Sequence, residues 1–322
     1  MTQEDAAGSV GAGEDQEITA RFSRDELVRG WAEREAIQPR VVPMVRIGAK
    51  TDLGRVRENN EDKFEFYEPD DATLLATRGS LYVVADGMGG AAAGQIASEL
   101  AIKNFLSAYY DNASDDIPTA LQQAVAVANS YVYNVARAIQ ERSGMGTTIT
   151  ALVLAQDRAY VAQVGDSRAY LIREGQIRQV SQDHSWVAEQ VRVGGLTAEE
   201  AELSPYRNII TRAIGTQEAV EPDIYTEEVR VGDTWVLCTD GLTGHVEDGE
   251  ILRVVNGQAP SEAARQLVEL ANARGGRDNI TVLIVAVREL HPVDAESVGE
   301  DPAEEAGSER PNRRGLRGFL GI

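Results

Sequence analysis

The chain has only one cysteine and three histidines among 322 residues, and this scarcity excludes several kinds of site. A single thiol, Cys238, cannot form an internal disulfide or a cysteine-based zinc site. Cys238 lies in a strand-like apolar run, which favours a buried core thiol over a catalytic one. The histidines are His184, His245 and His291, and no HExxH pattern is present. A histidine-rich metal site is therefore not expected either.

Long apolar runs and targeting patterns are also missing. No apolar run is long enough to span a bilayer. The N-terminal residues lack the basic-then-apolar pattern of a secretory signal. From these two observations we expect a soluble, cytoplasmic protein.

Basic residues are in deficit: 31 Lys and Arg stand against 52 Asp and Glu, for a net charge of −21. This balance argues against a nucleic-acid partner, because a protein that binds nucleic acid usually needs a basic face. Much of the excess lies near the ends of the chain. Residues 1–17 carry five acids, residues 294–309 carry seven, and neither segment has a basic residue. Both segments are expected to be solvated and disordered.

The composition changes divide the chain into three parts. Residues 1–44 are expected to form an acidic, partly disordered extension, in which Ser23 and Glu26 fit the capping box of a short helix over 23–37. That helix could pack on the domain or dock on another protein. Pro39 and Pro43 mark the boundary, and 45–290 is one compact domain. Residues 291–322 are an acidic linker with a basic and apolar end, either disordered or a docking or membrane-touching peptide.

The periodicity of residues 45–290 predicts an α+β fold. Two long helices are expected first, and a series of short β-rich segments follows them. Residues 186–208 interrupt the strands, with Gly194-Gly195 and a short helix that starts at Thr197 and has Glu200 in its capping box. We therefore expect two sheets packed inside and helices outside. The expected helices are 91–110, 118–141, 249–256 and 261–274 (with Ser261 as N-cap), and the expected strands are 147–155, 158–164, 167–173, 176–180, 224–231, 234–239 and 280–287.

Two Asp-Gly pairs stand at the ends of strand-like runs and are the most informative local feature. Asp86-Gly87 and Asp240-Gly241 each place a carboxylate at a rigid strand exit. Two further acidic sites are Glu61-Asp62 and Asp278-Asn279. Acids so widely separated in the chain make sense if they converge on hard metal cations, which prefer oxygen ligands. Each acid could instead cap a helix, form a turn or lie in a solvated loop.

Such a cluster suits the hydrolysis of phosphate esters, which is extremely slow in water. Two cations about 4 Å apart can bridge a water molecule, lower its pKa and neutralise the transferred phosphoryl group. A carboxylate between the cations must then be held firmly, as a strand end allows.

Eight motifs in order resemble the metal-dependent protein phosphatases of the type 2C (PPM) family in their bacterial form. The resemblance covers residues 51–287, about three quarters of the chain. It implies a central sandwich of two antiparallel sheets flanked by pairs of helices, in four layers. The motifs are TDLGRVRENNED (51–62), VADGMGG (84–90), GMGTT (144–148), VGDSR (164–168), DHS (183–185), TRAIG (211–215), TDG (239–241) and GRDN (276–279).

The resemblance also implies the ligands of two Mn²⁺ or Mg²⁺ ions. Asp86 would bridge both ions, and the carbonyl of Gly87 would bind one of them. Asp240 and Asp278 would hold one ion. Glu61 would hold the other, directly or through water, with Asp62 in the same shell.

Three further roles follow from the resemblance. Arg57 would bind the phosphate of the substrate, which suits a guanidinium, although a surface ion pair is the alternative. Asp166, together with Asp240, would bind a third, weaker metal ion, unless it only orders its turn. Residues 186–208, with Gly194 and Gly195, match the family's flap, and we expect them to regulate substrate entry and product release.

One position departs from many animal members of the family. They carry a histidine directly after the first Asp-Gly, proposed as the general acid, whereas this chain has Met88. A thioether cannot donate a proton, so a metal-bound water is the simplest substitute. His184 is a candidate because histidine side chains ordinarily titrate near neutrality, but a lone histidine is more often structural.

The sequence thus predicts a serine/threonine protein phosphatase that needs Mn²⁺ or Mg²⁺. Its expected partners are phosphorylated proteins, Ser/Thr kinases among them, and the resemblance favours a monomer. One alternative is a phosphatase that acts on another phosphoester. A second is a pseudophosphatase that binds phosphoproteins without turnover, although the acids such proteins commonly lack are all present here.

Overall fold

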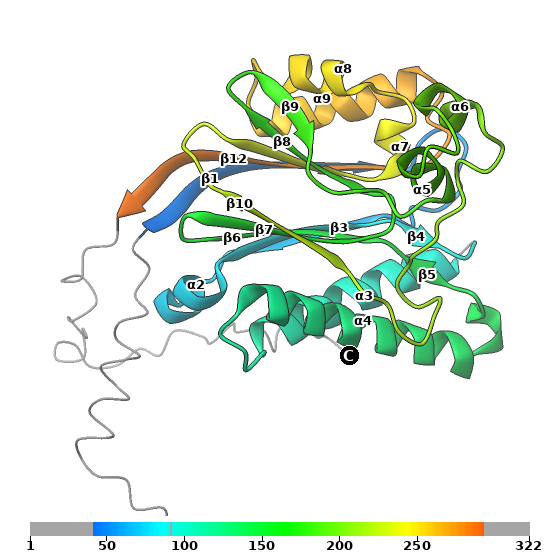
Figure 1. Ribbon diagram of the computed structural model, residues 1–322, viewed down its shortest axis with the longest axis horizontal. Coiled ribbons are helices and arrows are strands. Elements are labelled where there is room, and N and C mark those ends of the chain that lie inside the picture. The colour runs from blue at the N-terminus through cyan, green and yellow to red at the C-terminus, as the bar shows by residue number, and fades with distance from the viewer. Residues whose placement is uncertain (1–40, 91, 293–322) are drawn as a thin grey trace, which may run out of the picture. The chain divides into compact units, whose positions relative to one another are not determined.

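Two five-stranded antiparallel sheets face each other at the centre of the fold (Figure 1). The computed structural model describes residues 41–90 and 92–292. Sheet A has the order β1 (Val41–Asp52), β12 (Ile280–Pro292), β11 (Thr234–Cys238), β8 (Arg168–Arg173) and β9 (Gln176–Gln179). Sheet B has the order β10 (Asp223–Glu228), β7 (Arg158–Val164), β6 (Ile149–Ala155), β3 (Ser80–Ala85) and β2 (Lys63–Tyr67). A short pair joins β4 (Gly87–Met88) to β5 (Gly146–Thr147).

Helices cover the outer face of each sheet, so the fold has four layers (Figure 1). The helices α3 (Ala92–Tyr110) and α4 (Ile117–Ala138) pack on sheet B. The helices α7 (Asp240–Thr243), α8 (Asp248–Val255) and α9 (Pro260–Ala273) pack on sheet A. The remaining helices are α2 (Ala72–Arg78), the 3₁₀ turn η1 (Gln140–Arg142), α5 (Trp186–Arg192) and α6 (Ala198–Leu203). The predicted α+β architecture is confirmed.

The central strands are apolar on both faces because each sheet is buried between two layers. In β3, Leu81 and Val83 face the helices, whereas Tyr82 and Val84 face the other sheet. The same alternation runs along β12. A strand buried on both sides reads as a continuous apolar run, which is the pattern seen in the sequence.

The core also accounts for the cysteine. Cys238 is fully buried between sheet A and its helices, and burial raises the pKa of its thiol to about 12. The interpretation of Cys238 as a core thiol is thereby supported.

Several local expectations differ from the structure. Pro43 lies inside β1 rather than at a boundary, which is tolerated because β1 is an edge strand. The N-cap of α9 is Ala259, not Ser261, since Pro260 occupies the first turn, where its fixed φ and missing N–H fit. The helices α2 and α5 were not expected, because seven residues are too few for a clear period.

Other local expectations are met or cannot be compared. The capping box of Thr197 and Glu200 is confirmed at the start of α6. The expected helix over 23–37 and the expectations for residues 1–40 and 293–322 lie outside the described residues. In the described ranges, no helix is long and apolar enough to cross a membrane.

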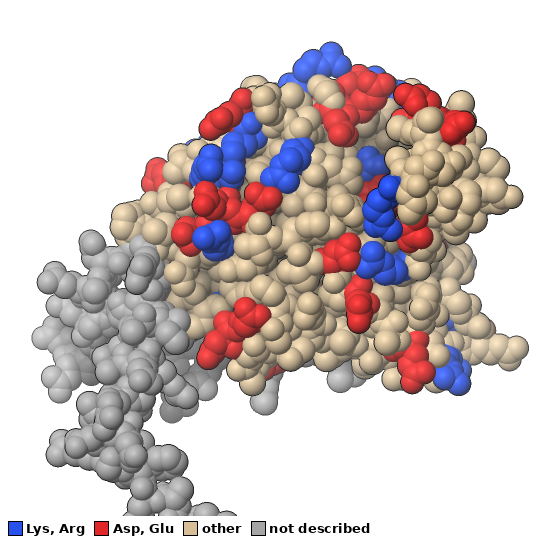
Figure 2. All heavy atoms as spheres, viewed as in Figure 1, with Lys and Arg blue, Asp and Glu red and all other residues tan. Residues whose placement is uncertain are grey.

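Acidic and basic side chains are interspersed over the face of the molecule shown in Figure 2, and many charged side chains of the described residues form ion pairs. Most are solvent-exposed, but Arg173 of β8 reaches a buried partner. Arg173 Nε and Nη2 each donate to Asp233 at 2.7 Å, and the Asp233 side chain is 1% exposed. This pair joins β8 to the turn between β10 and β11.

We expect Arg173→Ala to lower the free energy of unfolding by about 3 kcal/mol, because Asp233 would keep a buried and unpaired charge. Arg178→Ala is the matched control, since Arg178 pairs with Glu227 while 54% exposed and should cost under about 1 kcal/mol. Urea denaturation of both variants measures the difference. Equal losses of unfolding free energy in the two variants would contradict a larger contribution of the Arg173–Asp233 pair to stability.

Candidate active site

Acidic residues from five points in the sequence meet at one end of the sandwich. Sheet B supplies three of these points: Asp62 precedes β2, Asp86 follows β3, and Asp166 follows β7. Lys63 pairs with Ala85, so Asp62 and Asp86 leave adjacent strands together. Sheet A supplies the other two points, Asp240 after β11 and Asp278 before β12, and Cys238 pairs with Val282. The site therefore lies across the seam between the two sheets.

The backbone of Asp86 is fixed by the threonines of the 144–148 motif. Its N–H donates to Thr148 Oγ1 at 2.8 Å. Its carbonyl accepts from the Thr148 N–H at 2.9 Å and from Thr147 Oγ1 at 2.8 Å. These bonds leave the carboxyl group free to face the other acids.

The carboxyl groups repel one another strongly. Burial raises the pKa of Asp86 well above its usual range, and the charges of Asp62, Asp240 and Asp166 raise it further. Burial also raises the pKa of Asp240, with the charge of Asp278 adding to it, although a hydrogen bond from Asp86 acts the other way. A bond between two carboxyl groups needs a proton on one of them, so they cannot both be ionised without a nearby cation.

The pKa values of Asp62 and Asp166 are raised as well. Burial raises the pKa of Asp62 to about 7, although Thr239 Oγ1 donates to its Oδ2 at 2.8 Å. Burial raises the pKa of Asp166 to about 8, with the charges of Asp240 and Asp183 acting in the same direction.

The donor atoms fit hard divalent cations. One carboxylate oxygen (Oδ1) of each of Asp62, Asp166 and Asp240 is buried without a hydrogen-bond partner. A buried acceptor without a partner is costly, and a cation would satisfy it. Among residues 41–90 and 92–292, no three His, Cys, Asp or Glu side chains already form a ligand group for a single ion. Small divalent ions keep several waters and take one or two carboxylates each, which suits this arrangement.

Glycines leave room for Glu61 beside this cluster. A Cβ on Gly94 would lie 2.4 Å from Glu61 Oε2, and one on Gly87 would lie 2.2 Å from the Gly94 carbonyl oxygen. The Glu61 N–H donates to Asn279 Oδ1 at 2.8 Å, and Ser98 Oγ donates to the Glu61 carbonyl at 2.6 Å. Burial raises the pKa of Glu61, whereas the Arg57 charge lowers it. The importance of Gly94 was missed, although a glycine within an Ala-rich helix is a signal of close packing.

Arg57 lies at the rim of the cluster. Its Nη2 donates to Asp278 Oδ2 at 2.6 Å, and its side chain is 51% exposed. That hydrogen bond raises the pKa of Arg57, with the charges of Asp278, Glu61 and Asp86 acting in the same direction. Arg57 therefore lies beside a candidate metal ligand, in the exposed ion pair that is the alternative to phosphate binding, and its binding of phosphate stays a prediction.

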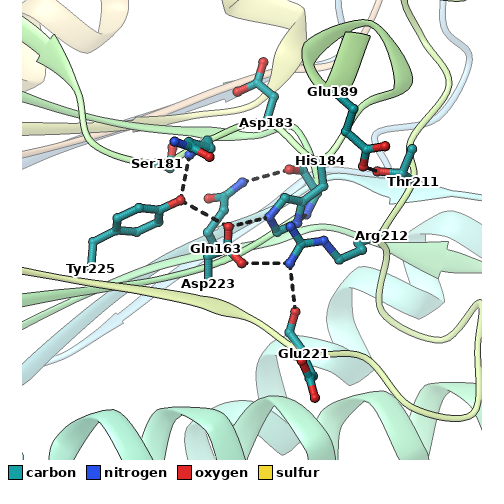
Figure 3. A network of polar contacts seen from close by, with 12 residues as sticks. Gln163, Ser181, Asp183, His184, Glu189, Thr211, Arg212, Glu221, Asp223 and Tyr225 are labelled. Carbon is teal, nitrogen blue, oxygen red and sulfur yellow. Dashed lines mark hydrogen bonds and ion pairs between the residues drawn. The ribbon is translucent and has the colours of Figure 1, made fainter. Parts of the chain in front are cut away.

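His184 lies at the base of the segment 186–208, beside Asp223 and Arg212 (Figure 3), and its backbone N–H donates to the carbonyl of Gly165, next to Asp166. The Gly165 N–H donates to His184 Nδ1 at 3.2 Å, so the proton of the neutral ring is on Nε2, which faces Asp223 Oδ2 at 3.2 Å. Arg212 Nη1 donates to the other oxygen of Asp223 at 2.7 Å. Burial lowers the pKa of His184. These contacts give His184 a structural part.

The segment 186–208 holds α5 and α6, with Gly194 and Gly195 between them. Two hydrogen bonds join its ends. The Trp186 N–H donates to the Ile209 carbonyl at 2.8 Å, and Thr211 Oγ1 donates to Glu189 Oε1 at 2.6 Å. Trp186 and Tyr206 stack edge to face, with their ring centroids 5.3 Å apart. The segment is thus a folded unit attached at its base.

Known proteins share this arrangement of sequence and fold. The family model for protein phosphatase 2C matches residues 49–280. The serine/threonine phosphatase stp of Listeria innocua is 37% identical over 241 residues, which cover 73% of this chain and 93% of that protein. The serine/threonine protein phosphatase PstP of Mycobacterium tuberculosis is 39% identical over 248 residues, which cover 77% of this chain and 46% of that protein.

Solved structures agree with the sequence relatives. The M. tuberculosis phosphatase PstP/Ppp superposes with a TM-score of 0.68 at 38% identity, covering 76% of this chain and 99% of that one. Stp1 of Staphylococcus aureus gives a TM-score of 0.71 at 32% identity, covering 77% and 97%. The catalytic domain of PstP in complex with two manganese ions gives 0.66 at 37% identity, covering 76% and 99%. A family match across most of the chain and relatives at this identity show that the chain belongs to the protein phosphatase 2C family.

Proposed function

We propose that this chain hydrolyses phosphoserine and phosphothreonine in proteins with the help of two divalent metal ions. The observation that carries the proposal is the buried cluster of carboxylates with unpartnered oxygens. Relatives named as serine/threonine phosphatases, and the manganese complex of PstP, support the substrate class and the metal. Proteins phosphorylated by Ser/Thr kinases, and the kinases themselves, are the proposed substrates.

We assign the metal ligands as follows. Asp86 would hold both ions, Glu61 and the Gly87 carbonyl would hold one of them, and Asp240 and Asp278 would hold the other. Asp62, which accepts a hydrogen bond from Thr239, would belong to the same shell, and Asp166 with Asp240 would hold a third ion. Bound Mn²⁺ or Mg²⁺ would supply Lewis-acid activation of water and charge neutralisation at phosphorus.

The chain's own residues orient the substrate and the ligands. Thr147 and Thr148 hold Asp86, Asn279 holds Glu61, and Arg57 at the rim would bind the phosphoryl oxygens. Met88 has no proton to give, and the Nε2 proton of His184 faces Asp223. We therefore infer that the leaving alkoxide takes its proton from water rather than from either side chain.

We further propose that residues 45–290 are the catalytic domain and that the protein acts as a monomer in the cytoplasm. Residues 186–208 would act as the flap that regulates substrate entry and product release. The attachment of this segment at its base through His184 and Thr211 supports that role.

Asp240→Asn should lower metal-dependent turnover at least about 100-fold, because a neutral amide binds a divalent cation more weakly than a carboxylate does. Hydrolysis of p-nitrophenyl phosphate and of a phosphothreonine peptide, with Mn²⁺, with Mg²⁺ and with EDTA, measures it. Asp248→Asn, on the exposed first turn of α8, is the matched control. Wild-type protein that is folded but inactive with every metal would favour a phosphoprotein-binding scaffold instead.

Arg57→Ala should raise the KM for the phosphopeptide more than it lowers kcat, since the guanidinium would mainly bind the phosphate. Steady-state kinetics with saturating Mn²⁺ separates the two constants. Arg55→Ala removes a nearby exposed cation and should change neither. A large loss of kcat at unchanged KM would argue for a role in the transition state alone.

The metal-free protein should lose stability as pH rises. The pKa values of Asp62 and Asp166 are about 7 and about 8 in the fold, above their ordinary value of 3.8. The folded state therefore binds more protons than the unfolded chain between about pH 4 and about pH 8, and stability falls with pH across that window. Thermal melts in EDTA at pH 5 and pH 8 should show the fall, and Mn²⁺ should reverse it at pH 8. Asp166→Asn should reduce the fall, and a Tm in EDTA that does not change with pH would contradict the argument.

A further inference from the structure

A recess lies on the outer face of sheet A, at the end away from the candidate active site. The strands β1 and β12 continue there beyond the helices that cover sheet A (Figure 1). Thr234, Ala286 and Arg288 line the recess, and the connection 256–259 between α8 and α9 also borders it. Its volume is about 460 Å³, a size typical of ligand sites. Thr234 begins β11, whereas Asp240 follows the other end of that strand.

The charge of the recess is opposite to that of the chain as a whole. Its lining includes two arginines, Arg46 and Arg288, and no acidic residue, although acids outnumber bases by 52 to 31. Neither arginine side chain forms a hydrogen bond or ion pair with any other residue in the described part of the chain, in contrast to those of Arg173 and Arg168. Two cations without partners in one recess favour an anionic occupant.

A third lining group favours a peptide over a simple anion. Gln258 Nε2 donates to Gln266 Oε1 at 2.7 Å, which fixes the side chain. Gln258 Oε1 is buried and has no hydrogen-bond partner, so it lacks an N–H or O–H donor. An acidic peptide offers both carboxylates for the arginines and backbone N–H groups for this oxygen.

We propose that the acidic segment 294–309 of the same chain docks in this recess. It carries seven acids and no basic residue, and Asp294 is only six residues after Arg288. The strand β12 continues to Pro292, about 13 Å past Arg288, so only residue 293 separates the strand from the acidic segment. The 16 residues of the segment span about 53 Å when extended, which is long enough for the chain to turn back onto the outer face of the sheet. A tether this short gives an effective concentration on the order of millimolar, so weak, salt-sensitive ion pairs suffice.

Docking there would hold residues 294–309 at the end of the sandwich opposite the metal ligands. Arg46 and Arg288 lie outside the catalytic machinery, so substitutions of them should leave hydrolysis of p-nitrophenyl phosphate unchanged. That activity also reports that the variants are folded.

The test uses the full chain with a spin label on Ser297→Cys. Cys238 is fully buried, so the label attaches at the introduced thiol. We expect broadening of the backbone amide signals of 256–259 in low salt. The broadening should disappear at about 0.5 M NaCl, where the Debye screening length is only a few ångströms. It should also disappear in the double variant Arg46→Gln/Arg288→Gln. Arg137→Gln/Arg158→Gln, which makes the same charge change on α4 and sheet B, should retain it.

Absence of broadening in the otherwise unchanged chain, or its persistence in Arg46→Gln/Arg288→Gln, would overturn the proposal. A mixture of labelled chain with unlabelled, isotope-enriched chain identifies the source of the contact. Broadening of 256–259 in the mixture would mean docking between two copies and would also overturn docking within one chain.

Discussion

The repulsion among buried carboxyl groups is the constraint on which the site depends. Asp62, Asp86, Asp166 and Asp240 lie close enough that each hinders the ionisation of another, and burial adds to the effect. Like charges in a poorly solvated place are costly unless a cation compensates them. The fold therefore has to hold these groups together against their repulsion, and it does so with backbone hydrogen bonds to Thr147, Thr148 and Asn279.

Rigidity comes from the packing of two sheets that each contribute part of the cluster. Sheet B carries Asp62, Asp86 and Asp166, and sheet A carries Asp240 and Asp278. The layer of apolar side chains between the sheets, with Trp235 and Tyr82 fully buried in it, fixes how the two strand ends face each other. A shift of one sheet against the other would separate the acids, so the central core also serves the site.

The two ends of the sandwich differ in their electrostatics. One end gathers unpartnered carboxylate oxygens, and the other has a recess with two unpaired arginines. The strands between them are buried on both faces, so each end can bind a ligand of opposite charge without contact between the two. Hydrolysis at one end and docking of an acidic segment at the other are thus compatible in one domain.

The sequence by itself determined most of the helices and strands and the set of acids, whereas the tertiary structure decided the contacts between them. Apolar periods of helix and strand and the Asp-Gly pairs are local, so the fold class and the positions of Asp86 and Asp240 at strand ends could be predicted from them. The pairing of Arg57 with Asp278, the hydrogen bond from the Glu61 N–H to Asn279 and the hydrogen bond from Thr239 to Asp62 could not be predicted. Each joins residues about 180 or more positions apart, and nothing local encodes which strand ends will meet. The space that Gly94 leaves for Glu61, and the short helix α5, likewise exist only because the surrounding layers pack as they do.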